Sequence, residues 1–203
     1  MQQPALKYIT PEEYLAMEEA AEQKHEYYQG EIFDMAGASK NHDRIGVDLG
    51  TSVNIALKGA QCEVFSDDMK VWIKAKNFFT YPDLIIVCGK AEFYEGRDDI
   101  ITNPLVIFEI LSDSTKKYDR IEKFEFYRSV PSFQEYILID QYRIHVEQMY
   151  LETPNKWVLS EYNEITDVLK LAKVNVQIPL QEIYRRVELA ESAAPRRNTK
   201  GEG

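Results

Sequence analysis

Two acidic residues stand beside or within apolar stretches of the chain, where carboxylates are uncommon. Asp83 comes directly before the run Leu84–Val87, and Glu109 interrupts the apolar run Pro104–Leu111. A carboxylate in such a place costs free energy unless a cation or a metal neutralises it. Both runs resemble buried β-strands, so the two carboxylates converge at one end of a sheet if these strands are neighbours. Converging carboxylate oxygens are the ligands that Mg²⁺ and Mn²⁺ take.

A lysine follows on a predicted helix that runs from Lys117 to Arg128. Asp119, Lys123 and Tyr127 recur at intervals of four residues, so they share one face of that helix. An ammonium aimed at two carboxylates could hold an attacking water or offset the charge on a phosphate, with Asp119 orienting Lys123. The alternative is an exposed Asp–Lys pair that contributes only about 0.5 kcal/mol.

Four blocks of sequence, in this order and at these spacings, resemble a known family. The blocks are Tyr81-Pro82-Asp83-Leu84, Glu109-Ile110-Leu111-Ser112-Asp113-Ser114-Thr115, Asp119-Arg120-Ile121-Glu122-Lys123 and Glu135-Tyr136-Ile137-Leu138-Ile139-Asp140. They look like the bacterial family of putative restriction endonucleases, which belongs to the PD-(D/E)XK phosphodiesterase superfamily. The resemblance extends over nearly the whole chain, from about Thr10 to Leu189.

The resemblance implies a restriction-endonuclease-like core, in which helices flank a mixed β-sheet and a divalent metal lies at one edge. Asp83 and Glu109 match the acidic metal ligands of that pattern, with Mg²⁺ as the expected cofactor and Mn²⁺ able to substitute. Many members of the superfamily carry a lysine two positions after the glutamate, where this chain has Leu111. We expect Lys123 to return an amine to the same space from the next helix.

Three further residues are weaker candidates for the same site. Glu31 could add a ligand or position a water, or it could be an exposed hairpin carboxylate. His42, just before a helix, could face phosphate or transfer a proton, although a single histidine is more often a cap or a surface residue. Asp68 could support the metal site, or it could be an ordinary turn aspartate.

The elements around these residues predict an α/β (α+β) fold with an additional antiparallel meander. Thr10-Pro11-Glu12-Glu13 is a helix start with a capping box, and this helix should run to about His25. Helices are also expected after Asn41 and over about 180–189. Strands are expected on either side of Gln29-Gly30, within 62–73, over 81–88, 104–111 and 135–140, and in a meander over 143–151, 157–162 and 168–171. One domain over residues 1–190 and a disordered tail over 191–203 account for the chain.

Composition excludes several classes of protein. The 203 residues carry a net charge of −10, which argues against a general nucleic-acid coat protein. Residues 1–35 hold most of this excess acid, whereas residues 112–129 are slightly basic. The start of the chain resembles no signal peptide, and no apolar run reaches the length of a membrane span, so we expect a cytoplasmic protein. Cys62 and Cys88 match no zinc spacing and are expected to be buried free thiols rather than a disulfide.

The function expected from these features is Mg²⁺-dependent hydrolysis of phosphodiester bonds in nucleic acid, with DNA favoured over RNA. A homodimer would suit cleavage of both strands of a duplex. The alternative is a non-catalytic oligomeric or regulatory protein on a degenerate nuclease fold, which Leu111 and the net charge of −10 favour.

Overall fold

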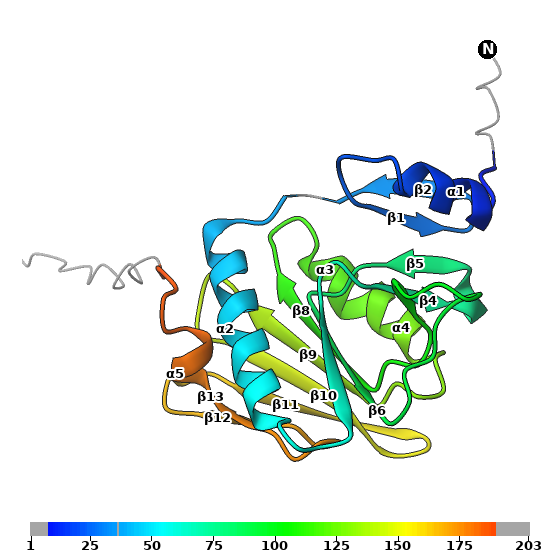
Figure 1. Cartoon of the computed structure of the whole chain (residues 1–203). Helices are drawn as coiled ribbons and strands as arrows, with labels where there is room; N and C mark the ends of the chain where they lie inside the picture. The colour runs from blue at the N-terminus through cyan, green and yellow to red at the C-terminus, as the bar shows by residue number, and fades with distance from the viewer. Residues whose placement is uncertain (1–7, 36, 190–203) are drawn as a thin grey trace, which may run out of the picture.

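The computed structural model of the chain describes residues 8–35 and 37–189, so the predicted tail over 191–203 lies outside the described residues. Its central element is a six-stranded sheet with the order β11-β10-β9-β8-β6-β3 (Figure 1). The strands of this sheet are β3 Cys62–Ser66, β6 Leu84–Cys88, β8 Val106–Leu111, β9 Glu135–Asp140, β10 Val146–Thr153 and β11 Lys156–Tyr162. Strands β8 and β9 run parallel and their other neighbours are antiparallel, so the sheet is mixed, as predicted.

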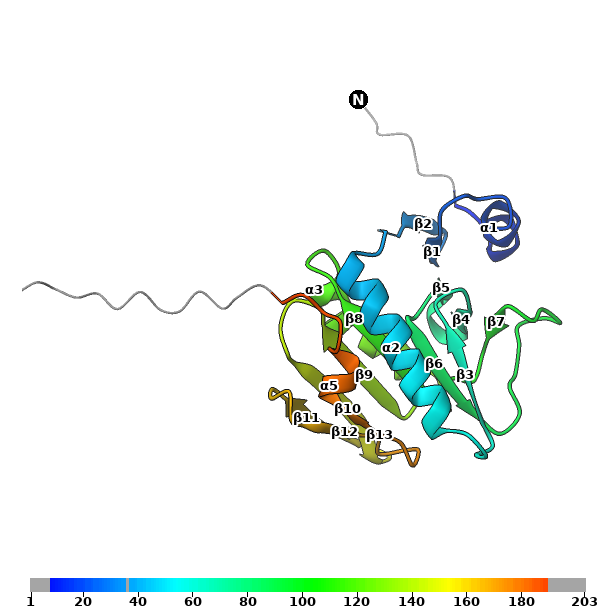
Figure 2. The same cartoon turned by 60° about the vertical axis from the view of Figure 1, so that its left-hand side comes forward.

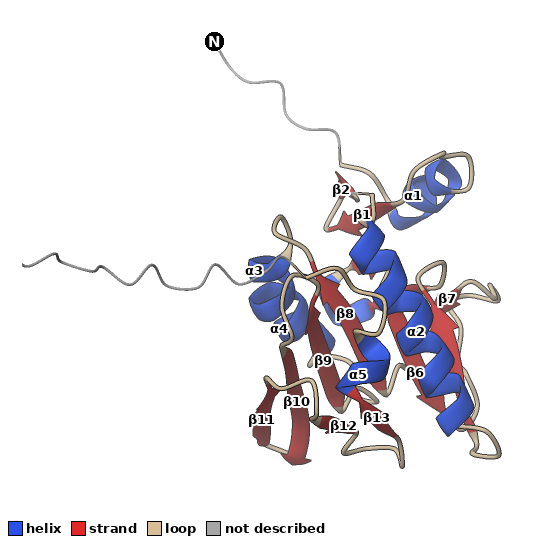
Figure 3. Ribbon diagram, turned by 90° about the vertical axis from the view of Figure 1, so that its left-hand side faces the viewer, coloured by secondary structure: helices blue, strands red, loops and turns tan. Residues whose placement is uncertain are grey.

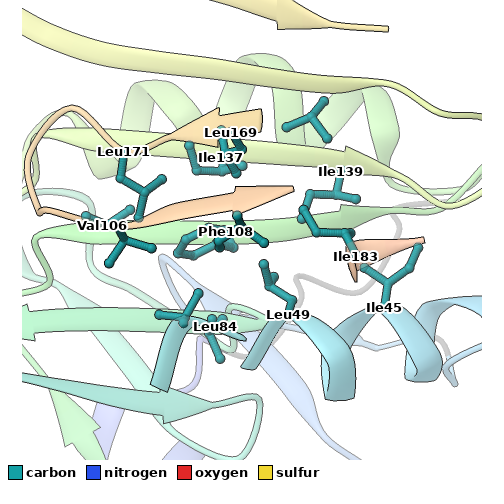
Figure 4. Close-up of a cluster of buried hydrophobic side chains, with 14 of the residues drawn as sticks. Ile45, Leu49, Leu84, Val106, Phe108, Ile137, Ile139, Leu169, Leu171 and Ile183 are labelled. Atoms are coloured by element: carbon teal, nitrogen blue, oxygen red, sulfur yellow. The ribbon is translucent and has the colours of Figure 1, made fainter. Parts of the chain in front are cut away.

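Helix α2 (Lys40–Ala56) covers one face of this sheet (Figure 3). It begins where the Ser39 hydroxyl accepts a hydrogen bond from the backbone N–H of His42. Its apolar side chains face the sheet: Leu49 lies beside Phe108 of β8, and Ile45 lies beside Ile183 and near Ile139 of β9 (Figure 4). Short elements close the same core: strands β12 (Val168–Lys170) and β13 (Gln177–Pro179), and helix α5 (Leu180–Ile183).

A helical segment between β8 and β9 covers the opposite face, as the connection between two parallel strands requires. The segment is α-helical at α3 (Lys116–Tyr118), π-helical at η2 (Asp119–Lys123) and α-helical again at α4 (Phe124–Tyr127). The predicted helix over 117–128 is therefore confirmed, with a wider turn at its centre. Such π-helical turns are rare and occur often at functional sites.

A second sheet of five strands, in the order β2-β1-β5-β4-β7, lies beside the helical segment (Figure 2). Its elements are β1 His25–Tyr28, β2 Glu31–Asp34, β4 Lys70–Ile73, the 3₁₀ turn η1 Lys74–Lys76, β5 Phe78–Thr80 and β7 Ile100–Ile101. Helix α1 (Pro11–Glu18) packs on it through an aromatic cluster that includes Tyr14, Tyr27 and Phe79. Gln29 and Gly30 both have positive φ, which is the backbone that the predicted β1–β2 turn needs.

Several predicted boundaries are wrong. Helix α1 ends at Glu18 rather than near His25, because the Glu18 carboxylate accepts hydrogen bonds from the His25 backbone and the Tyr81 hydroxyl, which turns the chain back. Helix α5 stops at Ile183, since the Tyr184 hydroxyl is held by the carbonyl groups of the β9–β10 connection. Strand β6 starts at Leu84 and not at residue 81.

The expectation of free thiols is also wrong, because Cys62 and Cys88 form a disulfide. The two residues lie directly opposite each other in the antiparallel β3–β6 pair, with Cα atoms 3.9 Å apart. Sequence spacing alone did not reveal this register. Among the described residues, no helix is long and apolar enough to cross a membrane.

Candidate active site

The sheet register brings the two predicted metal ligands together. Leu84 lies opposite Phe108 in the antiparallel β6–β8 pair, so Asp83, one residue earlier, falls opposite Glu109. One carboxylate oxygen of Asp83, Oδ2, accepts a hydrogen bond of 2.5 Å from the backbone N–H of Ile110. The two strands are therefore neighbours, which is the condition stated for convergence of the carboxylates, and Asp83 is held against β8 next to Glu109.

His42 reaches this pair from the first turn of α2. Its Nε2 atom lies 3.2 Å from the other carboxylate oxygen of Asp83, Oδ1. Burial would lower the pKa of His42, but the hydrogen bond and the charge of Asp83 outweigh burial and raise this pKa above its ordinary value. The structure thus places His42 beside the predicted ligand, on the α2 side of the sheet.

Lys123 lies among three carboxylates. Its Nζ atom is 3.0 Å from Glu26 Oε1, 3.3 Å from Glu109 Oε1 and 3.5 Å from Asp119 Oδ1, and its side chain is 6% exposed. We call these four residues the carboxylate–lysine cluster. The Tyr127 hydroxyl donates a hydrogen bond of 2.9 Å to Glu109 Oε1. Asp119, Lys123 and Tyr127 therefore share one face of the helical segment, as their spacing predicts. The alternative of an exposed Asp–Lys pair is wrong, because both side chains are buried.

The electrostatics of the cluster favour additional positive charge. Burial lowers the pKa of Lys123, but Glu109 and Glu26 more than compensate and hold it well above its usual range. Burial raises the pKa of Glu109 well above its usual range, and the nearby acids Asp119 and Asp83 add to this rise against the effect of Lys123. The pKa of Asp119 is raised as well, mainly by burial. One ammonium therefore faces more carboxylates than it neutralises.

Glu26 is the cluster member that sequence reasoning missed. It lies in β1, is 8% exposed and accepts a hydrogen bond of 2.5 Å from the Thr80 hydroxyl as well as the contact with Lys123. A signal was present in the sequence: strand alternation puts Glu26 on the same face as Tyr28, an aromatic residue that packs on Phe126 of α4. An acid sharing a face with a core aromatic residue was the better candidate for burial.

The structure does not bring Glu31 or Asp68 into the cluster. Glu31 is exposed on β2, opposite Tyr28 in the hairpin. Asp68 lies in the turn between β3 and β4, where its exposed carboxylate pairs with Lys24 at 2.8 Å. These positions match the alternatives stated for each residue, a hairpin carboxylate and a turn aspartate.

Leu111 occupies the position where the superfamily pattern has a lysine. Its side chain is buried in the core that also contains Tyr127 and Leu138, on the same face of β8 as Glu109. The ammonium that contacts Glu109 comes instead from Lys123, as expected from the sequence.

Asp83 and Glu109 present carboxylate oxygens, which are the type of ligand that a hard divalent cation takes. Both oxygens of Asp83 contact a neighbour, Ile110 N–H or His42, whereas Oε2 of Glu109 accepts no hydrogen bond from any residue within 8–35 and 37–189. Within those same ranges, no three His, Cys, Asp or Glu side chains already form a metal-binding group.

Sequence comparison relates the chain to one protein family and to two individual proteins. A model of the Uma2 family, described as "putative restriction endonuclease", matches residues 11–181. Two proteins of Synechocystis sp. described as uncharacterized are similar: sll1609 is 39% identical over 76% of this chain and 88% of its own length. The second, slr1290, is 34% identical over 87% of this chain and 92% of its own length.

A solved structure shares the fold. It is a protein from Anabaena variabilis described as a putative nuclease belonging to DUF820, with a TM-score of 0.67 and 18% sequence identity. The match covers 87% of this chain and 98% of that one. The predicted mixed sheet flanked by helices is therefore the fold of a nuclease-like neighbour.

Proposed function

This chain belongs to the Uma2 family of putative restriction endonucleases, and from that premise we propose that it is a Mg²⁺-dependent endonuclease acting on DNA. The observation that carries the proposal is the contact between Lys123 and Glu109 beside Asp83. A buried lysine aimed at a carboxylate opposite a second carboxylate supplies the charges that phosphodiester hydrolysis requires.

In this proposal, Asp83 and Glu109 hold the divalent ion, and Mn²⁺ substitutes for Mg²⁺. When bound, the ion polarises the phosphate and lowers the pKa of a bound water. Lys123 keeps its proton and offsets negative charge that develops on the phosphate. His42, hydrogen-bonded to Asp83, faces the same edge and could pass a proton to the departing oxygen.

The remaining residues position these groups. Glu26 and Asp119 hold the ammonium of Lys123, and the Tyr127 hydroxyl fixes Glu109. Glu26, and not the sequence candidate Glu31, is the acid of the β1–β2 hairpin that reaches Lys123. A homodimer, which would cut both strands of a duplex, is part of the proposal.

A plasmid-nicking assay tests the proposal on the full chain. We expect supercoiled plasmid to be nicked with Mg²⁺ or Mn²⁺ and not in EDTA, and the Asp83→Asn and Glu109→Gln variants to lose activity. Lys123→Ala should lower the rate by about 100-fold or more, the usual effect of removing one group that stabilises transition-state charge. Glu63→Gln on β3 and Lys58→Ala after α2 are matched controls, since both side chains are exposed.

The rival is a non-catalytic interaction protein, and the buried Leu111 in place of lysine favours it. The two functions give opposite results in the same preparation. No nicking with either metal, together with a melting temperature that neither Mg²⁺ nor Mn²⁺ changes, would overturn the nuclease and support the rival. Nicking that persists unchanged in Lys123→Ala would remove Lys123 from the mechanism.

A further inference from the structure

A cavity of about 860 Å³ opens at the same sheet edge as the candidate active site. We call it the strand-end cavity, because its lining comes from the ends of β8 to β11 and from the connections that follow them. Leu111 and Ser112 at the end of β8 form the side nearest the site, two to three residues after Glu109. The rest of the lining comes from the helical segment, from β9, β10 and β11 and from the connections beside them, and it includes Arg120, Asp140, Tyr142, Arg143, His145 and Glu147.

The topology explains why the cavity and the site share an edge. Strand β6 begins directly after Asp83 and runs antiparallel to β8, so the start of β6 lies beside the end of β8 at Leu111. Strand β9 runs parallel to β8 and ends beside it, at Asp140. Neighbouring strands lie about 4.8 Å apart, so a cavity over β9 and β10 is on the order of 5–10 Å from β8 along that edge. A nucleic-acid strand advances about 3.4 Å per nucleotide when stacked. A strand held at Asp83 and Glu109 therefore reaches the cavity within a few nucleotides.

The floor of the cavity is an ordered polar network. Arg120 donates to Glu147 through Nε at 2.9 Å and Nη2 at 2.7 Å. His145 is 6% exposed, and its two ring nitrogens lie 2.7 Å from Asn163 Oδ1 and 3.0 Å from Glu147 Oε1. These contacts hold donors and acceptors in fixed positions at the base of a space of ligand size.

The rim carries the more exposed groups of the lining. Tyr142 is 47% exposed, and its backbone N–H is fixed by Asp140 Oδ1 at 2.9 Å. The Arg143 side chain is 65% exposed and pairs with Asp140 Oδ2 at 3.0 Å. A planar aromatic ring and a guanidinium at the mouth of a polar cavity are suited to stacking on a flat, polar ring.

The charge balance of the lining selects the class of ligand. Three cationic side chains, Lys116, Arg120 and Arg143, are each paired with an acid of the lining, and Glu161 adds a further carboxylate. A phosphate would meet no net positive charge there, so the lining does not suit an anion. A neutral planar ring with both hydrogen-bond donors and acceptors matches these mixed groups.

We propose that the strand-end cavity binds an unpaired nucleobase. In a bound substrate strand, this base would lie a few nucleotides from the scissile phosphate. The enzyme would therefore bind single-stranded or locally opened nucleic acid. The inference rests on the proposed function, because the substrate strand would lead from the Asp83–Glu109 site into the cavity. A free nucleoside, which is neutral, offers the same ring and is the second source of this chemistry.

An abasic scan of a single-stranded oligonucleotide tests the inference by binding alone. The full chain in EDTA is titrated against a labelled ten-nucleotide DNA strand and against versions that each lack one base, with binding followed by fluorescence anisotropy at low salt. We expect loss of one base, or of two adjacent bases, to weaken binding by at least fivefold, while other positions change it by less than twofold. In Tyr142→Ala and Arg143→Ala variants this positional effect should disappear, and in Arg128→Ala, an exposed control, it should remain.

Competition with the four deoxynucleosides, which carry the base without a phosphate, separates the two sources of the base. Displacement of the strand by a millimolar deoxynucleoside in the unaltered chain, but not in Arg143→Ala, would show that a free nucleoside also binds the cavity. A flat abasic profile without such displacement would overturn the inference. Plasmid nicking is measured separately. Nicking together with a flat abasic profile would overturn the base site and leave the proposed nuclease function standing. A positional effect without nicking would overturn the nuclease function and leave the base site standing.

Discussion

At the scale of single residues, the candidate site is decided by which acid reaches Lys123. Glu26 and Glu31 are five positions apart on the same hairpin, yet only Glu26 reaches the helical segment. Glu26 lies with Tyr28 against α4, and Glu31, directly opposite Tyr28, is on the same face but on the outer strand β2, where it is exposed. The position of each strand in the sheet, rather than side-chain direction, therefore decides which acid is buried.

The first prediction concerns the ammonium at the centre of the cluster. Lys123→Met keeps the length of the side chain but leaves Glu26, Glu109 and Asp119 buried together without a cation. We expect the free energy of unfolding at pH 7 to fall by about 3–5 kcal/mol, the usual cost of leaving buried charge uncompensated. Urea unfolding followed by circular dichroism measures this change.

The matched control for that variant is Lys58→Met, on an exposed position after α2. It should change the free energy of unfolding by no more than about 0.5 kcal/mol. A loss below about 1 kcal/mol in Lys123→Met would contradict the picture of a charge cluster that depends on this lysine.

At the scale of elements, the connection before β7 is held by one aspartate. Asp99 accepts hydrogen bonds from Lys70 of β4 at 2.7 Å and from Arg97 Nε at 2.7 Å, and Lys70 also donates its backbone N–H to the Asp99 carbonyl. These contacts fasten the loop over 89–99 to β4, beside which β7 pairs in parallel. Hydrogen bonds from Arg97 lower the pKa of Asp99 to about 2, against the opposing effect of burial and with help from Lys70.

The second prediction is a pH dependence of stability at this contact. The pKa of Asp99 is lower in the folded chain than in the unfolded chain, where it is about 3.9. The contribution of Asp99 to the free energy of unfolding is therefore fully present at pH values above about 3.9 and is lost as the pH falls toward 2. The carboxylate is 34% exposed and partly screened, so we expect Asp99→Asn to cost about 1 kcal/mol at pH 7 and clearly less at pH 3. Urea unfolding at both values measures the difference, and Asp98→Asn, at an exposed neighbour, is the control.

The third prediction concerns the disulfide that joins β3 to β6. Cys62 and Cys88 close a loop with a sequence separation of 26, and a cross-link of this length stabilises a folded chain by about 3 kcal/mol. We expect a reductant to lower the free energy of unfolding by about that amount, measured in urea with and without the reductant. A double Cys62→Ser and Cys88→Ser variant should be insensitive to it. An equal free energy of unfolding of the original chain with and without the reductant would contradict the Cys62–Cys88 disulfide.

At the scale of the whole molecule, net charge limits how the protein can hold nucleic acid. Most of the net charge of −10 lies in residues 1–35, on the hairpin and α1 side, while the helical segment that follows β8 is slightly basic. Within the strand-end cavity the basic side chains are paired with acids. The molecule therefore lacks a broad basic surface near its proposed site among the residues that the structure describes.

The fourth prediction follows from this charge distribution. Binding of duplex DNA by the full chain in EDTA should be weak, and the logarithm of the binding constant should fall with the logarithm of salt concentration with a slope of about −2 to −4. Fluorescence anisotropy at NaCl concentrations from about 50 to about 200 mM measures this dependence. A slope steeper than about −6 would indicate an extended basic track and contradict the charge argument.

The sequence by itself determined the layout of the fold and the residues closest to the proposed chemistry. Apolar strands around Asp83 and Glu109, and helical spacing of Asp119, Lys123 and Tyr127, are local patterns, and each gave the observed element and face. These features depend on residues near one another in the chain, and local periodicity encodes them directly.

Only the tertiary structure decided what depends on pairing between distant segments. The β3–β6 register joins Cys62 to Cys88, and the placement of β1 beside the helical segment buries Glu26 rather than Glu31. The ends of four strands, brought to one edge, enclose the strand-end cavity. Register and sheet order are set by the packing of whole faces, and a shift of one residue would reverse every side chain, so spacing along the chain does not specify them.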